Sequence, residues 1–169
     1  MTVREMYAYL ERARRDLRAT LEATPDAILA QPLIAADRFR CLKDMLFHLI
    51  EVEDGWIQGD IRRLPMIQEQ FPALRESPGG PAFSNVPLSL LFDYWTAVAR
   101  ETQAFLSTLT PDDLERVVPV DDWPDKRLTV SGLLWHVMLH EVRHTAQMVV
   151  LLRNAGVQPP ALDLLFYLQ

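Results

Sequence analysis

Four histidines are the residues of this sequence best suited to metal chemistry, and three of them are spaced four residues apart. His136, His140 and His144 recur at the interval that places side chains on one side of a helix. Adjacent members of this series can share one ion. The outer two cannot, because they are about 12 Å apart along a helix that rises about 1.5 Å per residue. One of the three histidines therefore has a different role.

The apolar residues around these histidines indicate which two face the interior. The residues within about 60° of one line down the helix, at about 100° per residue, are Leu133, Val137, Met148 and Leu151. His140 and His144 fall about 20° to either side of that line, whereas His136 lies about 60° off it. His140 and His144 are therefore predicted to point into the protein, with His136 on the flank.

The fourth histidine, His48, shares a face with Met45 and Val52 in another predicted helix. It should therefore also point inward, where it can meet His140 and His144. Three imidazoles from two helices suit a divalent transition metal and leave coordination positions for water or substrate. Zinc and nickel are the preferred ions, with iron and manganese as alternatives, and the sequence identifies no catalytic residue.

Four long amphipathic segments must position these histidines. They are predicted over residues 3–24, 42–62, 87–109 and 129–154, the last with Thr129 or Ser131 as its N-cap and Gly156 as its stop. The connecting segments are 31–39, a proline-rich loop over 62–87, extended or looped residues 117–128, and a short final helix over 161–168. No segment alternates long enough to build a sheet. The expected fold is a single all-α domain over 1–169, an antiparallel four-helix bundle.

The composition excludes several classes of partner. The 169 residues carry a net charge of −6 and form no uninterrupted basic run, so neither nucleic acid nor an anionic membrane is expected to bind. No apolar stretch approaches the roughly 20 residues that span a bilayer, and the charged N-terminus does not resemble a signal peptide. Cys41 is the single cysteine and is expected to be a core residue. These features predict a cytoplasmic protein.

Two familiar metal motifs are alternatives to the three-histidine site. Residues 140–144 match the H-E-x-x-H pattern of zinc proteases, and Asp163 could be sought as a third ligand. That class also needs a strand beside its cleft, and Gly156 redirects the chain before Asp163. A di-iron bundle needs two E-x-x-H motifs and two more inward carboxylates, which the helices do not offer. Glu141 is then either a residue behind the metal ligands or, preferably, a solvated one.

The segments 44–48 and 136–147, together with the ending over 151–163, resemble the DinB/YfiT-like metalloenzymes along essentially the whole chain. The resemblance implies a four-helix bundle, frequently dimeric, whose metal is held by His48, His140 and His144. One departure is Thr145-Ala146, where the family often has Arg-Gly. Some relatives are thiol S-transferases or thiol-dependent isomerases, which implies a low-molecular-weight thiol as cosubstrate.

The leading hypothesis is therefore a metal-dependent enzyme that acts on a small molecule, with a thiol S-transferase as the specific form. The substrate pocket is expected where His48 meets His140, beneath the loop over 61–87, with walls from Trp56, Phe83 and Trp123. The alternatives are a non-catalytic metal- or ligand-binding bundle and a metal-dependent hydrolase. The outward apolar residues of the last helix, Trp135, Leu139, Val142, Ala146 and Val149, predict a homodimer contact, or else a surface covered by the C-terminal tail.

Overall fold

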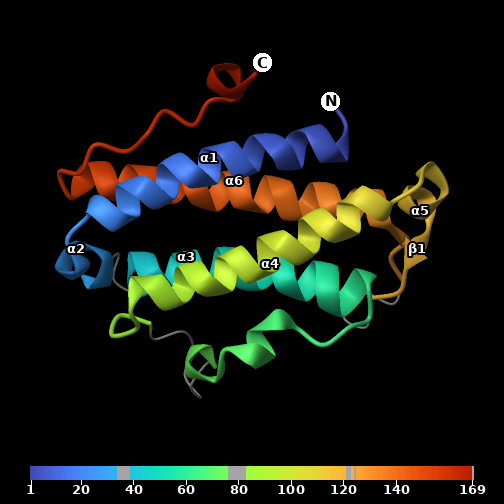
Figure 1. Ribbon diagram of the computed structural model, residues 1–169, viewed down its shortest axis with the longest axis horizontal. Helices are drawn as coiled ribbons and strands as arrows, with labels where there is room; N and C mark the ends of the chain where they lie inside the picture. Colours follow the sequence, from blue (N-terminus) through green and yellow to red (C-terminus); the bar gives the residue numbers. More distant parts are fainter. Residues whose placement is uncertain (34–38, 76–82, 121–122, 124, 169) are drawn as a thin grey trace.

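Four long helices form the antiparallel bundle that the sequence predicts (Figure 1). The computed structural model describes residues 1–33, 39–75, 83–120, 123 and 125–168. The long helices are α1 (Val3–Ala23), α3 (Leu42–Asp54), α4 (Leu88–Thr108) and α6 (Val130–Asn154). The short helices α2 (Asp26–Ala30) and α5 (Pro111–Glu115) lie in the connections, and α2 was not predicted.

The first helix shows how the sequence sets a boundary and a buried face. Thr2 accepts a hydrogen bond from the backbone N–H of Glu5, and the Glu5 carboxylate accepts one from the backbone of Thr2. This reciprocal cap satisfies two donors that the first turn of a helix would otherwise leave without a partner. The apolar stripe predicted for this helix is buried at Met6, Leu10, Ala13, Leu17 and Leu21.

The predicted helix over 42–62 is divided into two different helical forms. After α3 the chain continues as a π-helix, η1 (Gly55–Ile61), in which the turns are wider. Gly55 and Gly59 have low helix propensity, which weakens the regular α-helical pattern here. Short π-helical segments are frequent at functional sites, and this one carries Trp56.

Buried polar groups of α3 hold the proline-rich loop against the bundle. The Asp54 carboxylate accepts hydrogen bonds from the backbone N–H groups of Ile67 and Gln68, in the 3-10 turn η2 (Ile67–Gln70). Asp44 accepts one from the backbone N–H of Phe83. The described parts of this loop, which include the 3-10 turn η3 (Pro72–Leu74), lie beside α3 and α4 (Figure 1). Residues 76–82 of this loop, which was predicted to cover the substrate pocket, lie outside the described residues.

Both ends of α6 follow identifiable rules. The Thr129 hydroxyl accepts a hydrogen bond from the N–H of Gly132, so Thr129 is the N-cap and Ser131 is not. Just before it, β2 (Leu128–Thr129) pairs with β1 (Val117–Val118) as a two-residue antiparallel ladder within the region predicted to be extended. Gly156 has a φ of 80°, the left-handed conformation that ends helices.

The C-terminal segment is the least regular part of the described chain. The predicted short helix over 161–168 is a single 3-10 turn, η4 (Leu164–Tyr167).

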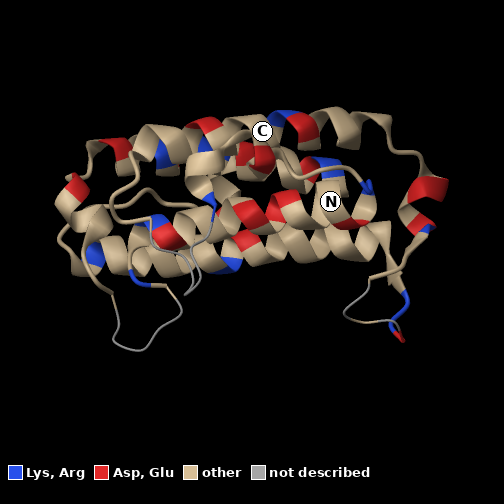
Figure 2. Ribbon diagram, turned by 90° about the horizontal axis from the view of Figure 1, so that it is seen from below, with Lys and Arg blue, Asp and Glu red and all other residues tan. Residues whose placement is uncertain are grey.

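No described helix has the length and apolar character needed to cross a membrane. In the described chain, Lys and Arg are interspersed with Asp and Glu along the helices (Figure 2).

Candidate metal centre

The packing of α3 against α6 brings three histidines together in the bundle interior. His48 comes from α3, and His140 and His144 are one turn apart on α6. One ring nitrogen from each lies within 4.8 Å of those of the other two. The ring centroids are 5.0 Å apart for His48 and His140, 5.1 Å for His48 and His144, and 4.3 Å for His140 and His144. The sequence prediction that these three residues converge is confirmed.

The cluster is almost closed to solvent. The exposed fractions are 8% for His48, 9% for His140 and 5% for His144. Phe39 packs on one side, with its ring centroid 4.9 Å from that of His48 and 5.7 Å from that of His144. Three buried imidazoles from two helices, with one ring nitrogen of each this close to the others, form a donor set that a single ion can bind.

Two of the three rings can be assigned a lone pair on nitrogen. Burial, reinforced by the positive charges of neighbouring groups, lowers the pKa of His140 to about 3, so this ring is unprotonated at neutral pH. Arg143 Nη2 lies 3.1 Å from His144 Nε2. Because a guanidinium can only donate, that ring nitrogen accepts and carries a lone pair. On the other helix, Glu51 lies 3.6 Å from His48 Nδ1 and can orient the ring.

This donor set fits a divalent transition metal. Neutral imidazoles are the commonest protein ligands for zinc, nickel and iron. A zinc ion binds its nitrogens at about 2.0–2.1 Å, so small side-chain rotations would bring the three nitrogens to that distance. No carboxylate belongs to the cluster among the described residues, and three ligands would leave coordination positions open.

The fourth histidine lies beside the cluster, on the flank predicted for it. His136 is exposed, and its ring centroid is 6.0 Å from that of His140. The His136 and Trp56 rings form a T-shaped contact with their centroids 5.5 Å apart, and the Trp56 ring is stacked on that of Trp123. These three residues line a pocket that includes neither His48 nor His140, so the prediction of Trp56 and Trp123 as walls of a pocket at those two histidines is not confirmed. The same prediction is wrong for Phe83, which packs on Phe47 in the core, with the ring centroids 4.1 Å apart.

A buried charge cluster lies next to the histidines and was not predicted. Arg14 Nη2 donates to Glu53 Oε2 at 2.6 Å and to Glu141 Oε2 at 2.5 Å. The Tyr7 hydroxyl donates to Glu53 Oε1 at 2.6 Å and accepts from Arg14 Nη1 at 3.0 Å. The preferred interpretation of Glu141 as a solvated residue is therefore wrong. The side chain is 5% exposed, because α1 covers the face of α6 on which it lies.

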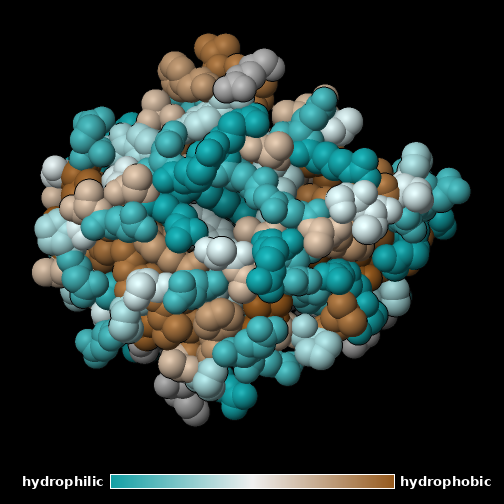
Figure 3. Space-filling view, in the orientation of Figure 1, coloured by the Kyte–Doolittle hydropathy of each residue, from teal (hydrophilic) through white to brown (hydrophobic). Residues whose placement is uncertain are grey.

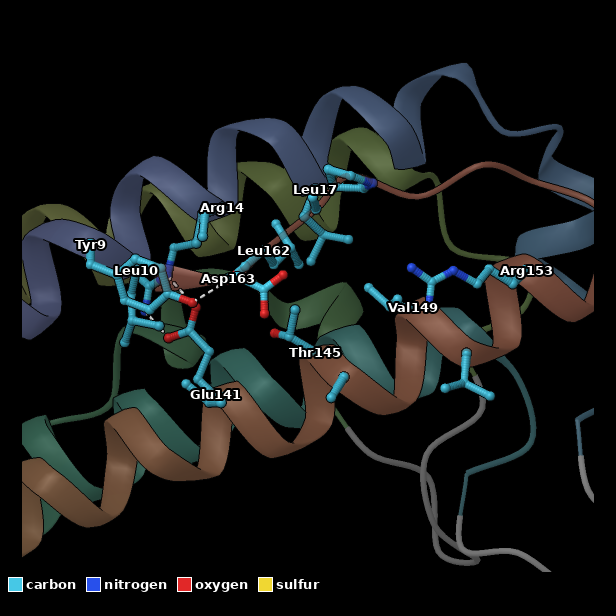
Figure 4. A pocket seen from close by; sticks show the side chains of 16 residues that line it. Tyr9, Leu10, Arg14, Leu17, Glu141, Thr145, Val149, Arg153, Leu162 and Asp163 are labelled. Carbon is cyan, nitrogen blue, oxygen red and sulfur yellow. Dashed lines mark hydrogen bonds and ion pairs between the residues drawn. The ribbon is translucent and has the colours of Figure 1, made fainter. Parts of the chain in front are cut away.

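The charge cluster borders a second pocket on a different side of α6 from the histidines. Figure 4 shows Arg14 and Glu141 at one end, between α1, α6 and the tail around Leu162 and Asp163. Its volume is about 400 Å³. Burial raises the pKa of Glu141, although Arg14 opposes that shift. This pocket does not include the three histidines.

Comparisons with known proteins agree with this fold. The model of the DinB family matches residues 1–169. A conserved protein from Enterococcus faecalis has a similar structure, with a TM-score of 0.71 and 17% identity over 90% of this chain and 96% of that one. A DinB-like protein from Bacillus cereus ATCC 10987 is similar with a TM-score of 0.59 and 17% identity, over 90% and 94% of the two chains. No curated protein matches the sequence.

Proposed function

Since the chain belongs to the DinB family, we propose that it is a metal-dependent enzyme whose divalent ion is bound by His48, His140 and His144. The observation that carries this proposal is the convergence of three buried imidazoles from α3 and α6. Zinc or nickel is the preferred ion, with iron and manganese as alternatives. When bound, such an ion polarises its open-position ligands and favours the thiolate form of a thiol.

We propose that the reaction is the transfer of a low-molecular-weight thiol to an electrophilic small molecule. In it, the sulfur–carbon bond forms while the bond from that carbon to its leaving group breaks, and the thiol proton is released to solvent. The residues of this chain would orient the reactants and limit the access of water to them. Phe39 covers the histidines on one side, and His136 lies between them and the pocket at Trp56.

Elemental analysis of protein purified without a metal-affinity column tests the site. We expect close to one equivalent of a transition metal in the wild type and a large loss in His140→Ala, because two imidazoles bind far more weakly than three. His136→Ala is the matched control, since that histidine is exposed and outside the cluster. Unchanged metal content in His140→Ala would show that the site is assigned wrongly.

The reaction is tested separately, by following thiol loss in the presence of an electrophile such as iodoacetamide. Metal-loaded wild type should accelerate it over His140→Ala. Turnover of an ester or amide without any thiol would instead identify a hydrolase. A fully loaded protein with neither activity would favour a non-catalytic metal-binding bundle.

We also propose a homodimer that uses the outward face of α6. Leu139 and Val150 on this face are 56% and 53% exposed, and Leu165 and Phe166 of η4 are 74% and 66% exposed. Hydrophobic residues of the C-terminal segment project at the top of the molecule in Figure 3. Large exposed apolar patches typically mark interfaces, and light scattering after size exclusion would measure the mass.

A further inference from the structure

A pocket of about 340 Å³ lies at the end of the bundle that holds β1 and β2, next to the histidine cluster. Six of the residues that line it have side chains able to recognise a ligand: Trp56, Trp123, Lys126, Arg127, Leu133 and His136. They come from η1, the segment before β2, and the first turns of α6. Nothing in the proposed metal chemistry requires this set of residues.

Two of the residues that line this pocket are cationic, and Asp125 directly precedes them in the chain. Lys126 and Arg127 both line it, and no Asp or Glu is among its lining residues in the described chain. The chain as a whole has a net charge of −6. The two cations that line this pocket can attract an anion.

The walls of the pocket are flat and apolar. The rings of Trp56 and Trp123 are stacked, with centroids 5.7 Å apart and planes 10° from parallel. The Lys126 ammonium lies 4.8 Å from the centroid of Trp123, where it adds a cation–π contact. Such walls favour an aromatic or aliphatic group next to the anion.

The pocket also leads toward the candidate metal centre. The centroid of the His136 ring lies 5.5 Å from that of Trp56 and 6.0 Å from that of His140. Trp56 itself is carried by the π-helix η1, whose wider turns are common at functional sites. A ligand in the pocket therefore lies one side chain away from the histidine cluster.

We infer that this pocket binds a small carboxylic acid with an aromatic or apolar body, as the specificity subsite for the electrophilic substrate. The carboxylate lies against Lys126 and Arg127, the body lies against Trp56 and Leu133, and the far end is directed past His136. This inference rests on the proposed function for the role of the ligand. The binding itself does not depend on the metal.

Titration of metal-free protein with phenylacetate, followed by calorimetry and tryptophan fluorescence, tests the inference. Phenylacetate should bind, and 2-phenylethylammonium, which has a similar size and the opposite charge, should not. Lys126→Gln and Arg127→Gln should each weaken phenylacetate binding about fivefold, the upper range for an exposed ion pair. Arg100→Gln removes the same charge from an exposed site on α4 and should have no effect.

Three further variants test the aromatic wall of the pocket and its independence from the metal site. Trp123→Phe retains an aromatic wall, whereas Trp123→Ala should abolish most of the binding; the side chain is 42% exposed, so the fold should tolerate both. His140→Ala should bind phenylacetate as the wild type does, which keeps the inference independent of the metal site. Equal binding of the two probes, unchanged affinity in Arg127→Gln and Lys126→Gln, or loss of binding in His140→Ala would each overturn the inference.

Discussion

Two polar clusters lie side by side in this bundle, and they satisfy burial in opposite ways. His140 belongs to one, and Glu141, the next residue of α6, belongs to the other. In the charge cluster of Tyr7, Arg14, Glu53 and Glu141, a central guanidinium donates to two carboxylates, so the cluster supplies its own counter-charge. The histidine cluster brings together three bases, and burial, with the neighbouring His144 and His48, lowers the pKa of His140. The chain therefore supplies the cation of the charge cluster itself, whereas the histidine cluster can bind a cation from solution.

This difference predicts that the two clusters respond differently to the loss of one member. Removing a member of the charge cluster leaves a buried charge without its partner, which destabilises the fold in any buffer. Removing a histidine abolishes an ion's binding site and changes stability mainly when that ion is present. The following predictions test this distinction.

The largest effect is expected for Arg14→Leu. Glu53 and Glu141 would remain buried next to each other with no cation between them, and breaking a buried ion pair in this way costs about 3–5 kcal/mol. Urea unfolding of metal-free protein would measure this loss. Arg15→Leu is the control, because it changes the same charge at an exposed position of α1. Similar unfolding free energies for the two variants would contradict a structural role of the cluster.

A smaller and conditional effect is expected for the histidine cluster. Zinc at about one hundred times its dissociation constant should stabilise the wild type by about 2.7 kcal/mol, since it binds the folded chain only. The stability of His140→Ala should not respond to the same addition. In metal-free buffer, His140→Ala should be close to the wild type, since the substitution removes a base that is costly to bury. An equal response to zinc in the two proteins would locate the ion elsewhere.

The sequence was sufficient to predict the four helices and the three histidines, because both follow from one periodicity. The same 3.6-residue repeat that buries Leu133 and Met148 directs His140 and His144 inward. The charge cluster could not be found in this way. Glu141 lies about 80° from the centre of the apolar stripe of α6, an angle typical of a solvated residue.

The Glu141 side chain is buried at that angle only because α1 packs over this face of α6 and provides Arg14. Sequence periodicity describes each helix alone, whereas the burial of Glu141 depends on a contact between residues 127 positions apart. The one clue in the sequence was Arg14 itself, an arginine adjacent to Ala13 on the apolar side of α1. The π-helix was also missed, since Gly55 and Gly59 indicate a weak helix without specifying its form.

The smallest effect is expected from the hydroxyl that completes the charge cluster. Burial raises the pKa of Tyr7 well above its ordinary value, so the group stays protonated and donates to Glu53 while it accepts from Arg14. Tyr7→Phe keeps the ring and removes both hydrogen bonds. Because the ion pairs persist, we expect a loss of about 1.5 kcal/mol in urea unfolding, the lower end of the range for a hydrogen bond to a charged group.

Tyr167→Phe is the matched control for this last measurement. The Tyr167 hydroxyl also donates to a carboxylate, that of Asp16, at 2.5 Å, but the pair is exposed to solvent. Water can replace that bond, so its loss should cost less than about 0.5 kcal/mol. A Tyr7→Phe protein as stable as Tyr167→Phe would mean that Arg14 satisfies both carboxylates alone. The charge cluster would then be a three-residue ion network around a cation from the chain itself, whereas the proposed cation of the histidine cluster comes from outside.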